Sequence, residues 1–437
     1  MTAVTWPAYD SYNCDESLWL RNVPVDWSSM RLQHIATCND NTLREFSYRD
    51  REIDYVDISS VDADSNTYTV QTMDFRNAPS RARRLAHHGD IVFSTVRPYL
   101  KAVATVANPN DKLVFSTGFA VIRPQPTVDP GFLGYVLRDH DFSAEVNMRS
   151  VGASYPAINV SDLLKLKVPF PPLTEQRIIS AFLDEKCAKV DEAVRIKEEQ
   201  IALLRERRQI LIQEAVTRGL NPNVPMKDTG VQWVGRVPEH WQIWKLAHAF
   251  PKLGSGTTPD TGQASFYDGG IAWLQTGDLN DGAATTTAKT VSKLAVRHYP
   301  TLKVYPPNSV VMAMYGATIG KLGILQIAAA TNQACCVLPK SQIVTPEFAF
   351  FCLLAMRPYI LSEAYGGGQP NISQNTVKNF RLPVPSVGEQ REITTFLDCE
   401  SERIDKALRI KLAQITAIKE YKATLINAAV TGKIKVA

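Results

Sequence analysis

Hydrophobic residues recur in alternating steps of four and three along two segments without proline or glycine, residues 174–218 and 389–431. The apolar positions on this spacing are Val190, Val194, Ile201, Leu204 and Leu211 in the first segment, and Ile404, Leu408, Ile415, Ile418 and Leu425 in the second. A period of about 3.5 residues is typical of a helix that packs against another helix. Two long helices are therefore predicted, at 173–219 and 387–437, and ~44 residues of helix could span roughly 66 Å.

We call each line of apolar positions the seam of its helix. Basic residues fill the remaining steps of both seams, at Lys197 and Arg208 in the first helix and at Lys411 and Lys422 in the second. Matching basic steps favour two helices that fit each other, although packing of each helix on its own domain alone stays open. Residues 174–219 hold nine Lys or Arg and nine Asp or Glu. This charge balance indicates a spacer with solvated faces available to partner proteins.

The helices belong to an internal duplication. The phrase EQRIISAFLD at Glu175 returns as EQREITTFLD at Glu389, 214 positions later, and the same offset places VPVDW on VPEHW. Over 174–217 and 388–431, 20 of 44 positions are identical, whereas the interiors, roughly 30–150 and 245–365, match poorly. We therefore predict one unit present twice, with domains at 1–172 and 220–386 and long helices at 173–219 and 387–437.

Each interior alternates β-branched runs with turn residues. Strands are predicted at 90–96, 113–123 and 309–314, and short helices at 129–138 and 346–356. The expected fold class is α+β: two duplicated mixed domains separated by the two long helices.

Composition narrows the class of protein. The 437 residues are 45% apolar and 21% charged, with a formal net charge of +4, as in an ordinary folded protein. The seven cysteines form no C-x-x-C, so neither a disulfide framework nor a metal site is expected. The N-terminal residues resemble no secretion signal and no segment is apolar enough for a bilayer, so a cytoplasmic location without membrane contact is predicted.

Positive charge is concentrated at matching places in the two interiors. Residues 76–101 contain Arg76, Arg81, Arg83, Arg84, Arg97 and Lys101 against Asp90 alone, and residues 286–321 contain Lys289, Lys293, Arg297, Lys303 and Lys321 without an acid. Sequence identity was lost there while the local charge was kept, as expected of a surface that binds phosphates. A solvated basic loop is the alternative for either copy alone.

Polar side chains that could reach base edges lie in the same regions. They are Ser94, Thr95, Thr117 and Tyr155 in the first copy, and Thr257, Thr258, Gln275, Thr276, Tyr315, Thr318, Asn332, Gln333, Gln369 and Asn371 in the second. Each of them is individually also compatible with a turn or a surface position.

Catalytic motifs are missing from the sequence. GATIGKLG at Gly316 has three residues instead of four between its glycines, and leucine replaces the Ser or Thr of a phosphate loop. We find no N/D-P-P-F/Y tetrapeptide of an amino-methyltransferase, and the adjacent His87 and His88 suggest no triad. We expect that this chain catalyses nothing alone.

With this organisation, the chain resembles the specificity subunit of type I restriction–modification enzymes. The resemblance is carried by WLRNVPVDW and WVGRVPEHW, by STVRPYLK, by GSGTTPDT and MYGATIGKLG, and by the two proline-then-EQR…FLD elements, and it covers essentially the whole chain. It implies two target-recognition domains that each read half of a split, asymmetric DNA site. It also implies that the long helices pair antiparallel and fix the gap between the half-sites.

The resemblance further implies partners and cofactors. Two modification subunits, which bind S-adenosylmethionine and methylate adenine, would dock on the helices, and two ATP- and Mg-dependent restriction subunits would complete the complex. No cofactor or metal is expected on this chain itself. Two other readings are a methyltransferase or nuclease with its own active site, and a coiled-coil adaptor that binds no DNA.

Overall fold

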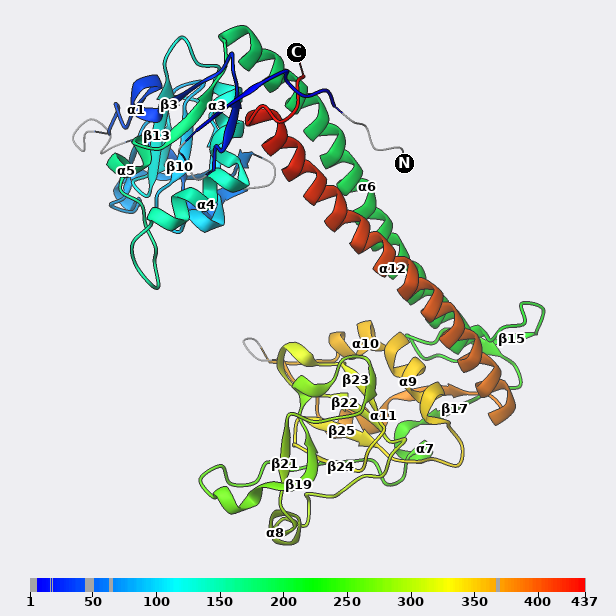
Figure 1. The fold of residues 1–437 in the computed structure, drawn as a ribbon. Coiled ribbons are helices and arrows are strands. Elements are labelled where there is room, and N and C mark those ends of the chain that lie inside the picture. The colour runs from blue at the N-terminus through cyan, green and yellow to red at the C-terminus, as the bar shows by residue number, and fades with distance from the viewer. Residues whose placement is uncertain are drawn as a thin grey trace. The chain divides into compact units, whose positions relative to one another are not determined.

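The computed structural model describes residues 6–15, 17, 19–43, 51–62, 66–366 and 370–436. The chain forms two compact units, each of which combines parts of both sequence copies (Figure 1). Unit 1 comprises Met1–Glu198 and Leu412–Ala437, and unit 2 comprises Glu199–Lys411. The domain boundaries drawn from the sequence therefore stay predictions, because each long helix is shared between two units.

Two four-stranded sheets form the interior of unit 1. The first has the order β11-β10-β13-β4 and the second the order β8-β5-β12-β9, in which β5 and β12 run parallel. The bounds are β4 (Ala36–Cys38), β5 (Glu52–Val56), β8 (Gln71–Asp74), β9 (Ala82–Arg84), β10 (Ile91–Ser94), β11 (Val103–Thr105), β12 (Leu113–Ser116) and β13 (Phe119–Pro124). Helices α3 (Pro130–Arg138) and α4 (His140–Arg149) pack on the first sheet, and the hairpin β6 (Val61–Asp62)–β7 (Thr67–Tyr68) adjoins it.

Unit 2 repeats this plan. Its sheets have the orders β18-β25-β22-β23-β20 and β21-β19-β24, with β19 and β24 parallel. The bounds are β18 (Gly254–Ser255), β19 (Tyr267–Leu274), β20 (Gly282–Ala284), β21 (Lys289–Val291), β22 (Val310–Ala313), β23 (Leu322–Leu325), β24 (Ala329–Thr331) and β25 (Cys335–Leu338), with helices α8 (Lys293–His298), α9 (Pro346–Ala355) and α10 (Arg357–Ser362). The run β11-β10-β13-β4 thus corresponds to β23-β22-β25-β18, although the interior sequences match poorly.

The two copies also share a frame of short elements. In unit 1 these are β1 (Tyr12–Cys14), β2 (Asn22–Pro24), β3 (Ser28–Arg31), α1 (Leu32–Ile35), α5 (Val160–Leu164) and β14 (Lys167–Phe170). In unit 2 they are β15 (Met226–Asp228), β16 (Arg236–Pro238), β17 (Gln242–Lys245), α7 (Leu246–Ala249), α11 (Gln374–Asn379) and β26 (Arg381–Val384). Strand β3 pairs antiparallel with β14, and β17 pairs in the same way with β26.

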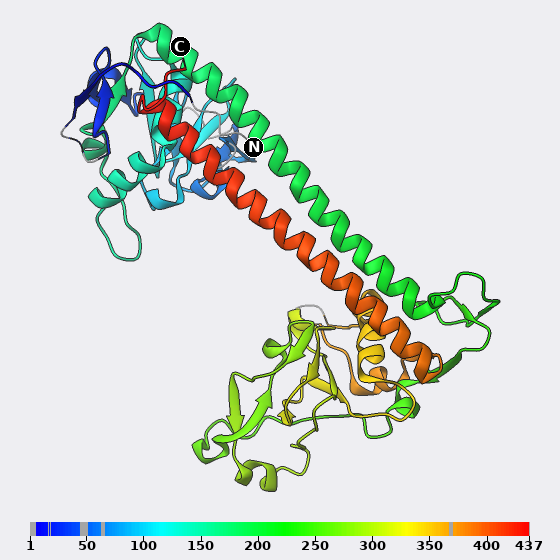
Figure 2. The same cartoon turned by 45° about the vertical axis from the view of Figure 1, so that its right-hand side comes forward.

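The long helices are α6 (Leu173–Arg218) and α12 (Val387–Val430). They lie side by side with opposite chain directions in Figure 1 and in the rotated view of Figure 2. Unit 1 contains the start of α6 and the end of α12, and unit 2 contains the remaining part of each. The end of α12 packs into the unit 1 core through Leu425, Ala429 and Val430, so packing of each helix on its own domain alone is wrong.

All ten apolar positions of the predicted seam are shielded. Val194, Ile201, Ile404 and Leu425 are buried, and Val190, Leu204, Leu211, Leu408, Ile415 and Ile418 are half-buried. Apolar residues off the seam are exposed instead, including Ile196, Leu203 and Ile210.

One predicted strand is wrong. Residues 113–123 form two strands, β12 and β13, which belong to different sheets and are separated at Thr117 and Gly118. The predicted helices at 129–138 and 346–356 are found as α3 and α9, each with proline at its start and a side-chain cap, Asp129 or Thr345. The α+β class with two duplicated domains and two long helices is confirmed.

Candidate nucleic-acid interface

The repeated phrase ties each long helix to its unit. Trp27 Nε1 donates a hydrogen bond to Glu175 Oε2 over 3.0 Å, and Trp241 Nε1 donates to Glu389 Oε1 over the same distance. Both tryptophans and both glutamates are related by the offset of 214 residues. The duplicated glutamate therefore has the same structural task in both copies.

The next residue of the phrase is a buried glutamine with a fully used amide. Gln176 and Gln390 are each 0% exposed. Gln176 Nε2 donates to Pro171 O and Thr127 O and its Oε1 accepts from Asp129 N, and Gln390 makes the same contacts with Pro385 O, Ile343 O and Thr345 N. Because Asp129 and Thr345 cap α3 and α9, each glutamine fixes the start of one of these helices against the long helix. The identical glutamines in the repeat were the signal for this role, which sequence reasoning missed.

Ion pairs join the long helices in each unit. Arg208 Nη2 lies 2.7 Å from Asp405 Oδ2 in unit 2, and Lys422 Nζ lies 2.6 Å from Asp191 Oδ1 in unit 1. The offset of 214 relates Arg208 to Lys422 and Asp191 to Asp405. The basic seam residue of each copy thus pairs with the acid of the other copy, as expected of two mutually fitted helices.

In unit 1, several predicted contact residues meet where β10 and β12 end. Thr95 Oγ1 donates to Gly118 O over 2.9 Å, and Thr117 N donates to Arg81 O over 2.7 Å. The exposed Arg81 guanidinium binds Tyr55 Oη at 3.0 Å and Asp57 Oδ2 at 2.6 Å. The hydrogen bond to Tyr55, and secondarily the nearby Asp57, raises the pKa of Arg81. This cluster presents a fixed cation beside two polar loop residues.

The other basic residues of the first copy lie around this cluster. Arg76 is exposed on the turn after β8. Arg83 and Arg84 on β9 are half-buried, the first 5.1 Å above the Phe75 ring and the second 3.4 Å from Thr42 Oγ1. Arg97 follows β10 and stacks on Tyr155, and Lys101 ends the same turn.

Ser94 must be removed from the predicted set. It is 1% exposed, and its Oγ donates to Val96 O over 2.7 Å. A buried hydroxyl with a satisfied hydrogen bond cannot reach a DNA surface without unfolding the strand end, so we do not propose Ser94 as a contact.

In unit 2, six predicted residues gather at the ends of β19 and β24. Leu274 and Thr331 are register partners in these parallel strands, so Gln275 and Asn332 leave the sheet side by side. The preceding loop closes on this point because Thr257 N donates to Thr331 O over 3.0 Å and Thr258 Oγ1 donates to Gln333 Oε1. A Cβ on Gly256 would lie 1.6 Å from Thr331 O, so only glycine permits this approach. Thr276 follows on the turn after β19.

The remaining predicted residues of the second copy fall into two groups. Tyr315 is 44% exposed, bridges Asn371, and accepts at its carbonyl from Thr318 Oγ1 over 2.9 Å, with Lys321 exposed just beyond. Lys289 on β21 and Lys293 on α8 are exposed away from this turn. Gln369 lies outside the described residues. Lys289 and Lys293 therefore lie on different elements from Lys321, and the second basic run does not form one continuous stripe.

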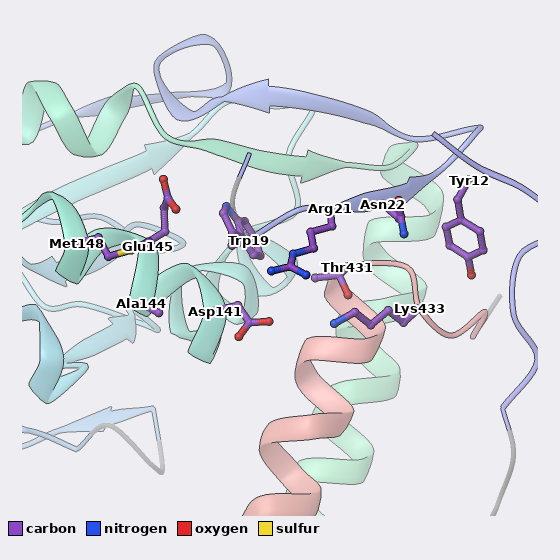
Figure 3. Close-up of a pocket in the computed structure, with 10 residues that line it drawn as sticks. All are labelled: Tyr12, Trp19, Arg21, Asn22, Asp141, Ala144, Glu145, Met148, Thr431 and Lys433. Atoms are coloured by element: carbon purple, nitrogen blue, oxygen red, sulfur yellow. The ribbon is translucent and has the colours of Figure 1, made fainter. Parts of the chain in front are cut away.

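A cavity of about 570 Å³ lies where β2, α4 and the end of α12 meet in unit 1 (Figure 3). Its lining combines Arg21 and Lys433 with Asp141 and Glu145. Asn427 Nδ2 on α12 donates to Asp139 and Asp141, which fastens the helix to α4 beside the cavity. The cavity thus belongs to the frame, not to the loops that carry the predicted contacts.

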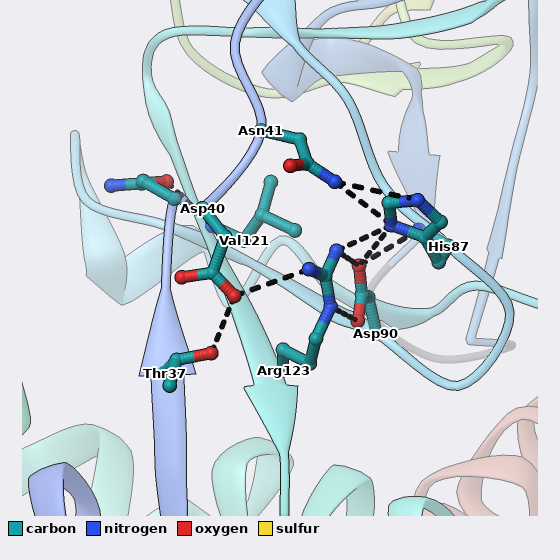
Figure 4. A network of polar contacts seen from close by, with 8 residues as sticks. Thr37, Asp40, Asn41, His87, Asp90, Val121 and Arg123 are labelled. Atoms are coloured by element: carbon teal, nitrogen blue, oxygen red, sulfur yellow. Dashed lines mark hydrogen bonds and ion pairs between the residues drawn. The ribbon is translucent and has the colours of Figure 1, made fainter.

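A polar network lies beside the start of β10, at the end of the strand opposite Thr95 (Figure 4). Asp90, 2% exposed, accepts from Arg123 Nε and Nη2 at 2.9 and 2.7 Å, and Arg123 Nη1 lies 3.1 Å from Asp40 Oδ2. The hydrogen bond to Asp90 raises the pKa of Arg123. His87 contacts the same guanidinium, so its surroundings are those of a structural ion pair.

The described residues contain neither a metal-binding cluster nor a membrane-spanning helix. No group of three or more His, Cys, Asp or Glu side chains is arranged there to hold a metal ion. Within the same residues, no helix has both the length and the apolar character needed to cross a bilayer. Burial raises the pKa of the Cys336 thiol to about 12, as expected of a core residue.

Comparison with known proteins identifies the family. The family described as the type I restriction modification DNA specificity domain matches residues 24–204 and again residues 238–416. The chain belongs to this family. The double match agrees with the duplicated frame. The protein provides the DNA sequence specificity of a type I restriction–modification system.

Relatives of similar length share this specificity-domain architecture. One relative comes from Methanocaldococcus jannaschii and is named as the specificity subunit of the type I restriction enzyme MjaX. It is 24% identical to this chain over 430 residues, which cover 95% of each chain. A chain from a structural study of type I complex assembly and conformational transition has a TM-score of 0.76 at 22% identity, covering 93% of this chain and 98% of that one. The HsdS subunit from Thermoanaerobacter tengcongensis has a TM-score of 0.54 at 23% identity, covering 94% and 98%. These two likenesses concern the fold.

Proposed function

We propose that this chain reads two different half-sites of one asymmetric DNA target for a type I restriction–modification complex. The observation that carries the proposal is a conserved frame around divergent loops. Both copies repeat the strand order and the Trp–Glu and Gln contacts, whereas the side chains at the strand ends differ. One scaffold with two unlike reading surfaces suits a bipartite site, because linking two readers makes the second binding event intramolecular.

The proposed contacts combine phosphate-binding and base-reading side chains. In the first copy they are Arg76, Arg81, Arg83, Arg84, Thr95, Arg97, Lys101, Thr117 and Tyr155. In the second copy they are Thr257, Thr258, Gln275, Thr276, Lys289, Lys293, Tyr315, Thr318, Lys321, Asn332, Gln333, Gln369 and Asn371. Clustering of the threonine, glutamine and asparagine side chains at the ends of β19 and β24 supports base reading there.

The frame is proposed to hold two modification and two restriction subunits, which would carry S-adenosylmethionine, ATP and Mg, and this chain would itself be non-catalytic. Cavities at equivalent places in the two units support two docking positions for the same kind of subunit. The unit 1 cavity is lined by Tyr12, Asn22 and Thr431, and a unit 2 cavity is lined by their counterparts at the offset of 214, Met226, Arg236 and Thr217.

The test is to map methylated adenines in host DNA with and without this gene, in cells that supply the partner subunits. A methylated, two-part motif that disappears with the gene is expected. Methylation by the purified chain alone would instead indicate an enzyme with its own active site, and an unchanged methylation map would contradict the proposed function.

A further inference from the structure

The half-buried Arg97, on the turn that follows β10 in unit 1, stacks on the exposed ring of Tyr155. The guanidinium carbon of Arg97 lies 4.2 Å from the centroid of the Tyr155 ring, and Tyr155 is 66% exposed. Stacking of this kind fixes the plane of the guanidinium, and therefore the direction of its N–H donors. A large aromatic ring left this open has no role in the core.

The stack leaves the terminal Nη donors of Arg97 without an acceptor inside the protein, as far as the described residues go. Among the described residues, no side chain or carbonyl accepts a hydrogen bond from this guanidinium, and its Nε is buried without a partner. By contrast, neighbouring Arg81 is held by Tyr55 and Asp57. An oriented fork without an internal acceptor is suited to an acceptor supplied from outside the protein.

The backbone at Arg97 is unfavourable for any residue with a side chain. Arg97 has φ 51° and ψ 56°, in the left-handed region, and its N–H donates to Pro156 O over 2.7 Å. The equivalent turn in copy two uses Gly316, with φ 64° and an N–H that donates to Pro370 O over 2.8 Å. Glycine adopts this conformation without steric cost, so copy two shows the residue that the turn alone would select.

Copy two lacks both members of the stack. Gly316 stands for Arg97, and the offset of 214 that aligns the frame places Gln369 on Tyr155 in the sequence. The turn itself is the same in both copies, since Val96 bridges Ala157 as Tyr315 bridges Asn371. The stack is thus an addition to a shared scaffold, at a place where the two readers differ and at a cost in backbone strain.

We infer that Arg97, held in plane by Tyr155, reads a guanine in the half-site of copy one by donating to O6 and N7 in the major groove. A bidentate fork on guanine is the contact that a planar, pre-oriented guanidinium makes best. Arg97 is the specificity-determining residue and Tyr155 is its positioning residue. The inference rests on the proposed function and adds one base identity to it.

The test replaces Arg97 with the residue of copy two. In the full complex, Arg97→Gly is expected to keep or raise the melting temperature while binding to the target weakens by about 10- to 100-fold. The methylated-adenine map should lose one guanine requirement in one half-site, with the other half-site and the gap unchanged. An unchanged or higher melting temperature together with the loss of one guanine requirement is a combination that a purely structural residue would not give.

A matched control lies on the same turn. Lys101 also has positive φ, 52°, where copy two has Gly320 at 77°. Lys101→Gly removes the same strain and the same charge, and should weaken binding without relaxing any base. Tyr155→Leu should relax the same guanine as Arg97→Gly, whereas Tyr155→Phe, which keeps the ring, should preserve the motif.

Three results would overturn the inference. The first is an unchanged methylated motif with Arg97→Gly, and the second is a lower melting temperature of this variant with its base specificity intact. The third is a uniform weakening of DNA binding on all sequences with a smaller salt dependence, which would make Arg97 a phosphate contact. Absence of any gene-dependent methylation with the unmodified chain would instead contradict the proposed function, so the two failures are distinguishable.

Discussion

At the scale of single residues, the Arg123–Asp90 pair gives a prediction about stability. Asp90 is 2% exposed, and Arg123 provides two of its hydrogen bonds. Arg123→Met is expected to lower the unfolding free energy of unit 1 by about 3 kcal/mol, because it leaves a buried carboxylate without its cation. The shift of the urea unfolding midpoint measures this effect.

The control removes the charge as well. Asp90→Asn combined with Arg123→Met should recover part of the loss, since no unpaired charge is then buried. Arg403→Met is a matched surface change, because Arg403 is 71% exposed and pairs with Glu400 on its own helix. Equal destabilisation by Arg123→Met and Arg403→Met would contradict the argument.

Residue type alone could not separate the residues proposed to contact DNA from the interior ones. Ser94 and Thr95 are neighbours at the end of β10, but Ser94 is buried and Thr95 is half-buried on the loop side. Successive residues on a strand point to opposite faces, and which face is covered depends on the second sheet and on α3. The stack of Arg97 on Tyr155 joins residues far apart in sequence, and only the fold brings them together.

At the scale of elements, local signals predicted the helices better than the strands. Helices α3 and α9 follow from a capping Asp129 or Thr345 with proline next to it. The run 113–123 was one apolar stretch in the sequence, and Gly118 was the sign of a break, which the structure uses to send β12 and β13 to different sheets. Sheet membership depends on non-local pairing, so the sequence pattern could not assign it.

The turn and strand at β9 lead to a prediction about salt. Changing Arg81, Arg83 and Arg84 together to Ala should weaken DNA binding and reduce the magnitude of the slope of log K against log salt by about 0.9 for each arginine that contacts a phosphate. Titrations of the complex from low to high salt measure this slope. An unchanged slope would remove β9 from the phosphate contacts.

The matched variant removes three other cations of unit 1. Lys165, Lys189 and Arg195 pair with acids three or four residues away on their own helices or turns, and their side chains are 56%, 69% and 57% exposed. Changing them to Ala alters net charge equally. Their loss should leave the slope close to that of the unmodified protein.

At the scale of the whole molecule, duplication was the feature that the sequence predicted best. The offset of 214 predicted the duplicated frame, and the same offset relates the two Trp–Glu contacts and the Arg208–Asp405 and Lys422–Asp191 ion pairs found in the structure, because a repeated frame repeats its contacts. The shared strand order of the interiors could not be predicted in this way, since sheets tolerate nearly complete replacement of side chains if burial is kept.

The paired helices lead to the last prediction. Inserting seven residues into each helix, within 190–211 and 404–425, keeps the seam in register, because seven residues are two turns of a 3.5-residue repeat. If the helices set the distance between the two readers, the gap should lengthen by about three base pairs, from ~1.5 Å per residue and ~3.4 Å per base pair. The half-sites should stay the same, because the strand-end loops are untouched. Mapping methylated adenines in cells that carry the variant measures both quantities, and altered half-sites with the original gap would contradict the spacer role.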